Sequence, residues 1–201
     1  MELKYKQSAS SDVIPLGSKC RKYSLQVISG LLLIAFSTLA PAALDRVGDF
    51  ALLDNAGTFH QLSRYQHRKA LVLMAYSDEC ATMDALLDSF KGIAVEYAGN
   101  DFEFLLIDSQ DLDRAQLYGL GTELPILEDG GQLVSEKLNI ENAGDVLVLN
   151  PERLSLFYKG QPSQELESVL TSITGEGVSD TIRQSGAGCA IDYQMKELHS
   201  E

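Results

Sequence analysis

Cys80 is the residue of this chain whose type and position best suit chemistry. It follows an apolar run over residues 69–76 and precedes a run over 81–97 whose apolar side chains repeat at helical spacing. A thiol at a strand-to-helix turn faces the free N–H groups at the helix start, which stabilise a thiolate. Asp78 and Glu79 act in the opposite direction, because nearby negative charge raises the pKa of a thiol. Cys80 is therefore either a reactive thiol or a buried structural cysteine.

The first 43 residues have the pattern of an export signal. Basic residues precede an apolar run over 25–39, and small residues of the type found at cleavage sites follow at 40–43. We expect a cleaved signal peptide over 1–43, and the alternative is an inner-membrane anchor over 24–40. Either arrangement places the remainder outside the cytoplasm, in the periplasm or another extracytoplasmic space.

Cys189 and Ser77 complete the candidate catalytic set with Cys80. Cys189 is either the resolving or disulfide partner of Cys80 or an unpaired thiol in the tail. Ser77 either positions a peroxide or caps the helix that follows. Disulfides persist in exported proteins, and residues 174–188 are long enough to return across a domain. We therefore predict that Cys80 and Cys189 approach closely enough to form a disulfide.

Composition excludes several classes of function. The formal net charge of −13 argues against nucleic-acid binding, which requires a basic face. The three histidines and three cysteines show no zinc-ligand spacing, so we expect no metal site and no cofactor. Membrane association is expected only through the N-terminal segment.

Hydrophobic periodicity predicts one α/β domain over residues 44–173, followed by a tail over 174–201 that carries Cys189. The pattern predicts a hairpin over 47–62, strands at 69–76, 102–107, 145–150 and 153–158, and helices at 81–97, 112–118, 131–138 and 165–173. Two buried strands joined by a helix imply a parallel βαβ unit. The closing strands and helix then give a mixed central sheet with helices on both faces.

Several segments carry a family resemblance: VGDF at 47–50, NAG at 55–57, LVLMAYSDEC at 71–80, FEFLLID at 102–108, LPILED at 124–129 and DVLVLN at 145–150. Over roughly residues 46–160 the chain resembles the thioredoxin-like redoxins, the group of alkyl hydroperoxide reductase and thiol-specific antioxidant proteins. GCAI at 188–191 is similar to a C-terminal segment of some exported redoxins. The resemblance implies a thioredoxin-like fold with an N-terminal β-hairpin and thiol chemistry at Cys80.

The chain also departs from that family at three places. Met83 stands where the second cysteine of C-x-x-C is expected. In the peroxiredoxin motif P-x-x-x-T-x-x-C, Ser77 can replace the threonine, but Leu73 occupies the proline position. The usual Thr-Pro pair, with its cis proline beside the active cysteine, reads Ala143-Gly144 here. Glycine can adopt the unusual backbone angles of that loop but does not enforce them.

Two functional hypotheses follow. In the first, the chain is an exported thiol oxidoreductase whose Cys80 thiolate attacks a small peroxide or the disulfide of a protein partner. Cys189 or an external thiol then resolves the intermediate. In the second, it is a catalytically degenerate redoxin module that acts in protein binding or assembly. The reactivity of Cys80 distinguishes them, because a catalytic thiol has a lowered pKa.

Overall fold

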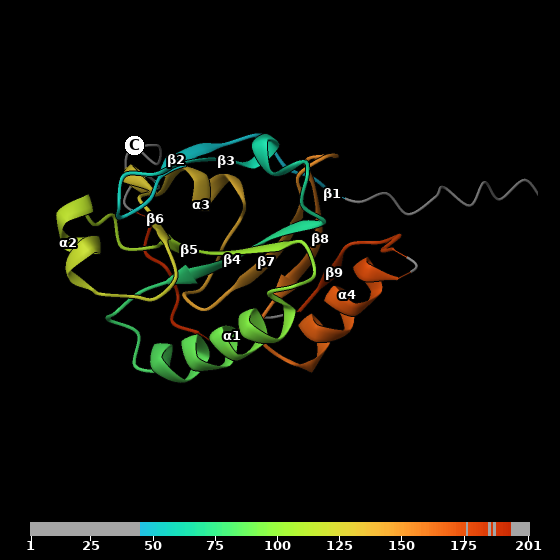
Figure 1. The fold of residues 1–201 in the computed structure, drawn as a ribbon. Coiled ribbons are helices and arrows are strands. Elements are labelled where there is room, and N and C mark those ends of the chain that lie inside the picture. The colour runs from blue at the N-terminus through green and yellow to red at the C-terminus, as the bar shows by residue number, and fades with distance from the viewer. Residues whose placement is uncertain (1–44, 176, 185, 187, 194–201) are drawn as a thin grey trace, which may run out of the picture. The chain divides into compact units, whose positions relative to one another are not determined.

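The computed structural model describes residues 45–175, 177–184, 186 and 188–193, so the predicted leader lies outside the described residues. A mixed β-sheet forms the centre of this part of the chain (Figure 1). Its strand order is β1-β8-β7-β4-β5-β6, and β9 also pairs with β8. This architecture confirms the predicted thioredoxin-like α/β fold.

The longer strands of the central sheet lie close to the segments that the sequence predicted as strands. They are β1 (Asp45–Arg46), β4 (Ala70–Tyr76), β5 (Phe102–Asp108), β6 (Ile126–Leu127), β7 (Val146–Asn150), β8 (Ser155–Gly160) and β9 (Ile182–Arg183). The predicted parallel unit is β4 and β5, with β6 parallel to β5, whereas β7 and β8 run antiparallel. The predicted hairpin is β2 (Ala51–Leu53) and β3 (Phe59–Gln61), which form a separate two-stranded sheet.

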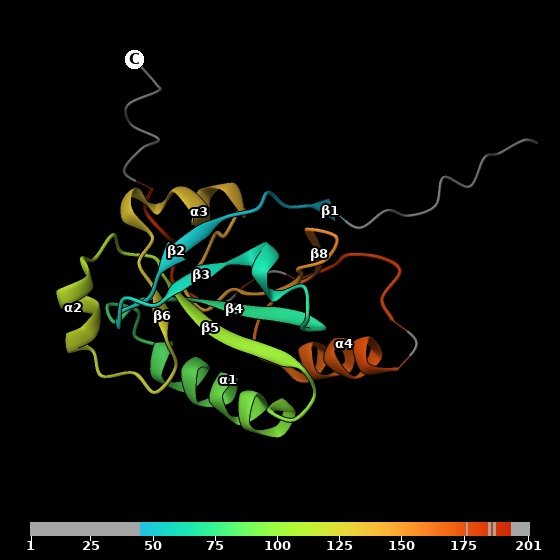
Figure 2. The ribbon, with the colours of Figure 1, turned by 45° about the horizontal axis from the view of Figure 1, so that its top comes forward.

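Helices cover both faces of the central sheet. They are α1 (Met83–Tyr97), α2 (Arg114–Gly119), α3 (Leu133–Lys137) and α4 (Gln164–Thr174), with 3-10 turns η1 (Leu62–Tyr65) and η2 (Gly130–Gln132). Helices α1 and α4 lie on one face, and α3 and the hairpin lie on the other (Figures 1 and 2). Alternate β4 residues divide accordingly, with Val72 and Met74 in one apolar cluster and Leu71 and Leu73 in the other.

Two predicted helix boundaries need correction. Helix α1 begins at Met83 rather than at residue 81, because the chain first makes a turn in which the Met83 amide donates to the Cys80 carbonyl at 2.9 Å. The helix predicted over 131–138 is divided into η2 and α3, since Gly131 and Gln132 have φ of 68° and 54°. In the part of the chain that the structure describes, no helix is long and apolar enough to cross a membrane.

Candidate active site: a disulfide beside a polar cavity

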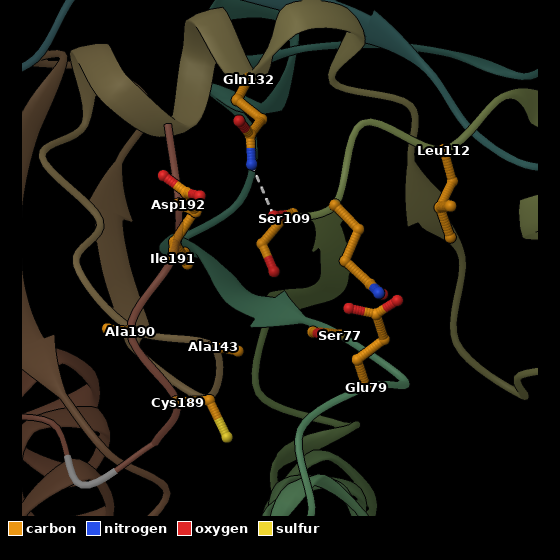
Figure 3. Close-up of a pocket in the computed structure, with 11 residues that line it drawn as sticks. Ser77, Glu79, Ser109, Leu112, Gln132, Ala143, Cys189, Ala190, Ile191 and Asp192 are labelled. Carbon is orange, nitrogen blue, oxygen red and sulfur yellow. Dashed lines mark hydrogen bonds between the residues drawn. The ribbon is translucent and has the colours of Figure 1, made fainter. Parts of the chain in front are cut away.

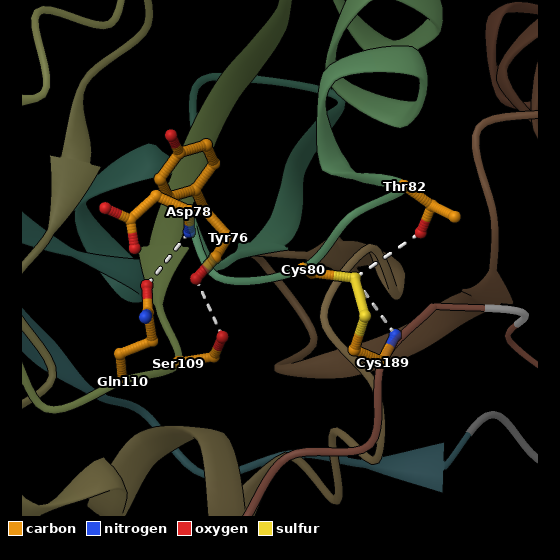
Figure 4. The surroundings of a disulfide bond; sticks show 7 residues. All are labelled: Tyr76, Asp78, Cys80, Thr82, Ser109, Gln110 and Cys189. Carbon is orange, nitrogen blue, oxygen red and sulfur yellow. Dashed lines mark hydrogen bonds between the residues drawn. A yellow bond between two sulfur atoms is a disulfide. The ribbon is translucent and has the colours of Figure 1, made fainter.

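Cys80 and Cys189 form a disulfide, which confirms the predicted pairing (Figure 4). Their Cα atoms lie 5.6 Å apart, within the range that a disulfide requires. The two cysteines are 109 residues apart in the sequence. Closing a loop of that length stabilises the folded state by about 4–5 kcal/mol in the chain-entropy model. The bond therefore ties the tail firmly to the start of α1.

Cys80 is held in the turn between β4 and α1. Its amide donates to the carbonyl of Ser77 at 3.3 Å, and only 4% of the residue is exposed. Its sulfur lies 3.4 Å from the hydroxyl of Thr82 and accepts the amide of Cys189 at 3.3 Å (Figure 4). A thiolate released at Cys80 would thus find hydrogen-bond donors already in place.

Cys189 is positioned by backbone pairing with the loop before β7. The amide of Ala143 donates to the carbonyl of Cys189 at 2.8 Å. The next tail residue, Ala190, makes an isolated antiparallel bridge with Asn142. Gly188 lies so close to this loop that a Cβ atom there would overlap the carbonyl oxygen of Ala143. Backbone hydrogen bonds at Cys189 and Ile191 therefore hold this part of the tail against the loop.

A buried ion pair stabilises the loop before β7. The Asp145 carboxylate accepts hydrogen bonds from the backbone amides of Glu141 at 3.0 Å and Asn142 at 3.1 Å. Lys159, on β8, places its Nζ 3.9 Å from the same carboxylate and donates to the carbonyl of Asn139 at 2.5 Å. Both charged side chains are buried, so the pair fixes the loop to the sheet.

Gly144 takes the place of the expected proline without a cis bond. The described residues contain no cis peptide, and Gly144 instead adopts φ of 95°. Its amide donates to the carbonyl of Ala75 at the end of β4, at 2.7 Å. A Cβ atom at this position would lie 2.5 Å from Cδ1 of Leu86 on α1. Proline can provide neither that angle nor that amide, so glycine is required by this local structure.

A polar cavity of about 360 Å³ lies beside the disulfide (Figure 3). Ser77, Ser109 and Gln132 line it, and each is less than 10% exposed. Gln132 donates from Nε2 to the carbonyl of Ser109 at 2.6 Å, and the Ser109 hydroxyl donates to the carbonyl of Tyr76 at 2.7 Å. The remaining lining residues are Glu79, Gln110, Leu112, Ala143, Cys189, Ala190, Ile191 and Asp192.

The cavity wall is anchored by Asp108 at the end of β5. Its carboxylate accepts the amides of Gln110 at 3.0 Å and Leu112 at 2.6 Å. Burial raises the pKa of Asp108 to about 6, and the negative charge of Asp129 contributes in the same direction. The two amides oppose this increase, because they favour the ionised form. Asp108 therefore titrates in a weakly acidic range while it holds the loop that carries Ser109.

The structure brings together all three candidate residues from the sequence. Ser77 lines the cavity with Cys189, and the residue before α1 is Thr82, so Ser77 is not the cap of that helix. Met83, at the position of the expected second cysteine, is buried in the core. Sequence reasoning missed Ser109 and Gln132. Ser109 had a usable signal, because it follows a buried strand whose carboxyl end meets that of β4.

In the described part of the chain, no three side chains of the His, Cys, Asp and Glu types cluster closely enough to hold a metal ion together. The cysteines are joined to each other, and the buried Asp108 and Asp145 accept backbone amides. The site is thus built around sulfur and hydrogen-bonding groups.

Comparison with solved structures shows that the fold of this chain is similar to thioredoxin-like folds. A hypothetical protein from Sinorhizobium meliloti matches with TM-score 0.64 and 22% identity, over 76% of this chain and 95% of that chain. A putative thiol:disulfide interchange protein DsbE from Chlorobium tepidum matches with TM-score 0.56 and 13% identity, over 66% and 98%. The exposed lipoprotein thioredoxin Etrx1 from Streptococcus pneumoniae matches with TM-score 0.52 and 21% identity, over 63% and 98%. No family model and no curated protein matches the sequence.

Proposed function

We propose that this protein is a thiol-disulfide oxidoreductase that uses Cys80 and Cys189 as its redox pair. The observation that carries the proposal is the disulfide itself, which joins a cysteine before α1 to a cysteine on a paired tail segment. Met83 removes the usual partner from the helix, and Cys189 supplies a second sulfur from 109 residues away. The proposed partners are proteins or peptides that carry thiols or disulfides.

The exchange needs no other reactant than the partner. A partner thiolate attacks one sulfur of the disulfide, the S–S bond breaks, and the second cysteine leaves as a thiolate. A second partner thiolate then attacks the partner sulfur of the mixed disulfide. This step forms a disulfide in the partner and releases the protein as a dithiol. The reverse sequence reduces a partner disulfide and restores the disulfide of the protein.

Disulfide exchange fits the site better than reduction of a peroxide. The residues lining the cavity include two acidic side chains, Glu79 and Asp192, and no arginine or lysine that could polarise a peroxide. Peroxide reduction is therefore the less favoured activity, and the enzyme assay below tests it with hydrogen peroxide as the substrate.

We also propose that the domain acts outside the cytoplasm. The leader pattern over 1–43 supports export, and one protein of similar fold is an exposed lipoprotein thioredoxin. A stable disulfide agrees with an oxidising compartment. N-terminal sequencing of the protein recovered from the periplasm tests the cleavage. A sequence that starts at Met1 would contradict the signal peptide.

A binding module without catalysis is the second candidate, because Cys80 is only 4% exposed. In that case the disulfide would serve only to hold the tail.

Measurement of catalytic turnover distinguishes the two functions. The wild type should catalyse oxidation of a reduced dithiol peptide with glutathione disulfide as the oxidant, and Cys80→Ser and Cys189→Ser should each abolish it. Ser89→Ala, on the exposed side of α1, serves as the control and should retain full activity. Equal rates in all four proteins would refute the oxidoreductase. Hydrogen peroxide as substrate tests the peroxidase in the same variants.

A further inference from the structure

The two cysteines of the disulfide differ in their exposure to solvent, and this difference has a chemical consequence. Cys80 is 4% exposed and belongs to the apolar cluster that contains Met83 and Ala143. Cys189 is an exposed residue. Of the two cysteines, Cys189 lines the polar cavity and Cys80 does not, among the described residues that form its wall (Figure 3). A molecule that enters the cavity therefore meets Cys189 first.

We propose that a partner thiol attacks the disulfide at Cys189, so that the mixed disulfide forms on the tail and Cys80 is the leaving group. This assignment rests on the proposed function and reverses the roles expected from the sequence, in which Cys80 makes the covalent bond to the partner. It assigns the cavity between β4, β5 and the tail as the site that receives the partner thiol.

The surroundings of Cys80 suit a leaving group. Thiol-disulfide exchange is faster when the departing sulfur is stabilised as a thiolate. The Thr82 hydroxyl at 3.4 Å and the amide of Cys189 at 3.3 Å already contact the Cys80 sulfur. Helix α1 starts three positions later and runs for 15 residues, and its first N–H groups favour negative charge nearby. The Cys80 thiolate would form without rearrangement of these groups.

The cavity indicates the chemical class of the partner group. Its buried side chains Ser77, Ser109 and Gln132 are hydrogen-bonding groups that suit the amides of a peptide. Glu79 and Asp192 also line the cavity, in a chain with a formal net charge of −13. A cysteine in a peptide segment with neighbouring basic residues matches both features, because opposite charge speeds encounter.

The reaction on Cys189 balances without any further reactant. The peptide thiolate attacks Sγ of Cys189, and the electron pair of the S–S bond moves to Sγ of Cys80. The products are a peptide–Cys189 disulfide and a Cys80 thiolate. A second peptide thiolate attacks the peptide sulfur, which gives the peptide disulfide and a Cys189 thiolate. Two thiols are oxidised to one disulfide, and one protein disulfide is reduced to two thiols.

Trapping the intermediate tests this assignment directly. The oxidised full-length protein is mixed with the acetylated and amidated peptide Gly-Lys-Cys-Lys-Gly, quenched at short times with excess N-ethylmaleimide, digested and analysed by mass spectrometry. We expect the peptide on Cys189 and the maleimide on Cys80, with about a tenfold or greater excess over the reverse pattern, because exchange rate follows access to the attacked sulfur. The reverse pattern would overturn the assignment and leave the oxidoreductase intact.

Two matched substitutions test the route through the cavity. Ala190 lines the cavity and Ala81 follows Cys80 outside it, and both residues are exposed. We expect Ala190→Phe to slow reduction of the disulfide by the peptide by about fivefold or more and Ala81→Phe to change it by less than about twofold, since only the first blocks access to Cys189. Slowing by Ala81→Phe alone would overturn the assignment. A wild-type disulfide that resists both this peptide and the reduced dithiol peptide of the activity assay would instead refute the proposed function.

Discussion

The amide of Ala143 donates a 2.8 Å hydrogen bond to the carbonyl of Cys189, and this bond links the loop before β7 to the tail segment that carries Cys189. The contact uses backbone atoms only. A tail residue held in this way can keep its position while its side chain exchanges bonding partners. The site therefore separates the positioning of Cys189 from its chemistry.

Gly188 should be essential for that backbone pairing. A Cβ atom at position 188 would overlap the carbonyl oxygen of Ala143, which cannot rotate away as a side chain would. We expect Gly188→Ala to shift the equilibrium between dithiol and disulfide toward the dithiol by about 1–3 kcal/mol, the usual effect of overpacking. Equilibration in glutathione buffers followed by alkylation and mass spectrometry measures the shift. Gly99→Ala is the control, since a Cβ atom at Gly99 has nothing within 4 Å. Equal equilibria in the two variants would show that the tail does not depend on this contact.

Gly144 allows a comparison between backbone strain and steric overlap. Gly144 and Gly57 have φ of 95° and 82°, so alanine is strained at both positions. A Cβ atom at Gly144 would also lie 2.5 Å from Leu86, whereas at Gly57 it has nothing within 4 Å. We expect Gly57→Ala to lower the unfolding free energy by about 1–2 kcal/mol. Gly144→Ala should lower it by about 1–3 kcal/mol more, because overpacking is added.

Urea denaturation of the two alanine variants provides this measurement. The double variant Gly144→Ala with Leu86→Ala removes the overlapping methyl group and should recover part of the added loss. If Gly144→Ala and Gly57→Ala lose the same stability, Leu86 moves aside freely and the overlap has no energetic effect.

The sequence predicted the sheet and its helices because their apolar residues repeat with periods set by buried strands and amphipathic helices. It also predicted the approach of Cys189 to Cys80, from the number of cysteines and the length of chain between α4 and Cys189. It could not indicate that Cys189 and Ala190 pair with the loop, since that pairing depends on three-dimensional backbone positions. Gln132 was likewise hidden, because it reaches the cavity from a left-handed turn that no periodicity marks.

The buried pair of Lys159 and Asp145 should be important for the loop that receives the tail. Nζ of Lys159 lies 3.9 Å from Oδ2 of the buried Asp145 and 3.6 Å from the carboxylate of Glu141, so it supplies positive charge beside both. We expect Lys159→Met to lower the unfolding free energy by about 3–5 kcal/mol, the usual loss when one member of a buried pair is removed. Lys91→Met is the matched control: Lys91 pairs with the exposed Glu123 at 3.6 Å, and such pairs contribute about 0–1 kcal/mol. Comparable losses in thermal or urea denaturation would contradict the assigned role.

Asp108 should titrate at an unusually high pH for an aspartate. Burial raises its pKa to about 6 from an ordinary value of 3.8. Between these values the folded chain holds a proton that the unfolded chain has lost. The contribution of Asp108 to stability is therefore greatest below about pH 4 and decreases as the pH rises through about 6.

NMR of the carboxyl carbons in the ¹³C-labelled protein measures the pH at the midpoint of the Asp108 titration. The amide signals of Gln110 and Leu112, which donate to this carboxylate, should shift with the same midpoint. A midpoint for Asp108 at or below the ordinary value of 3.8 would show that the two amides outweigh burial.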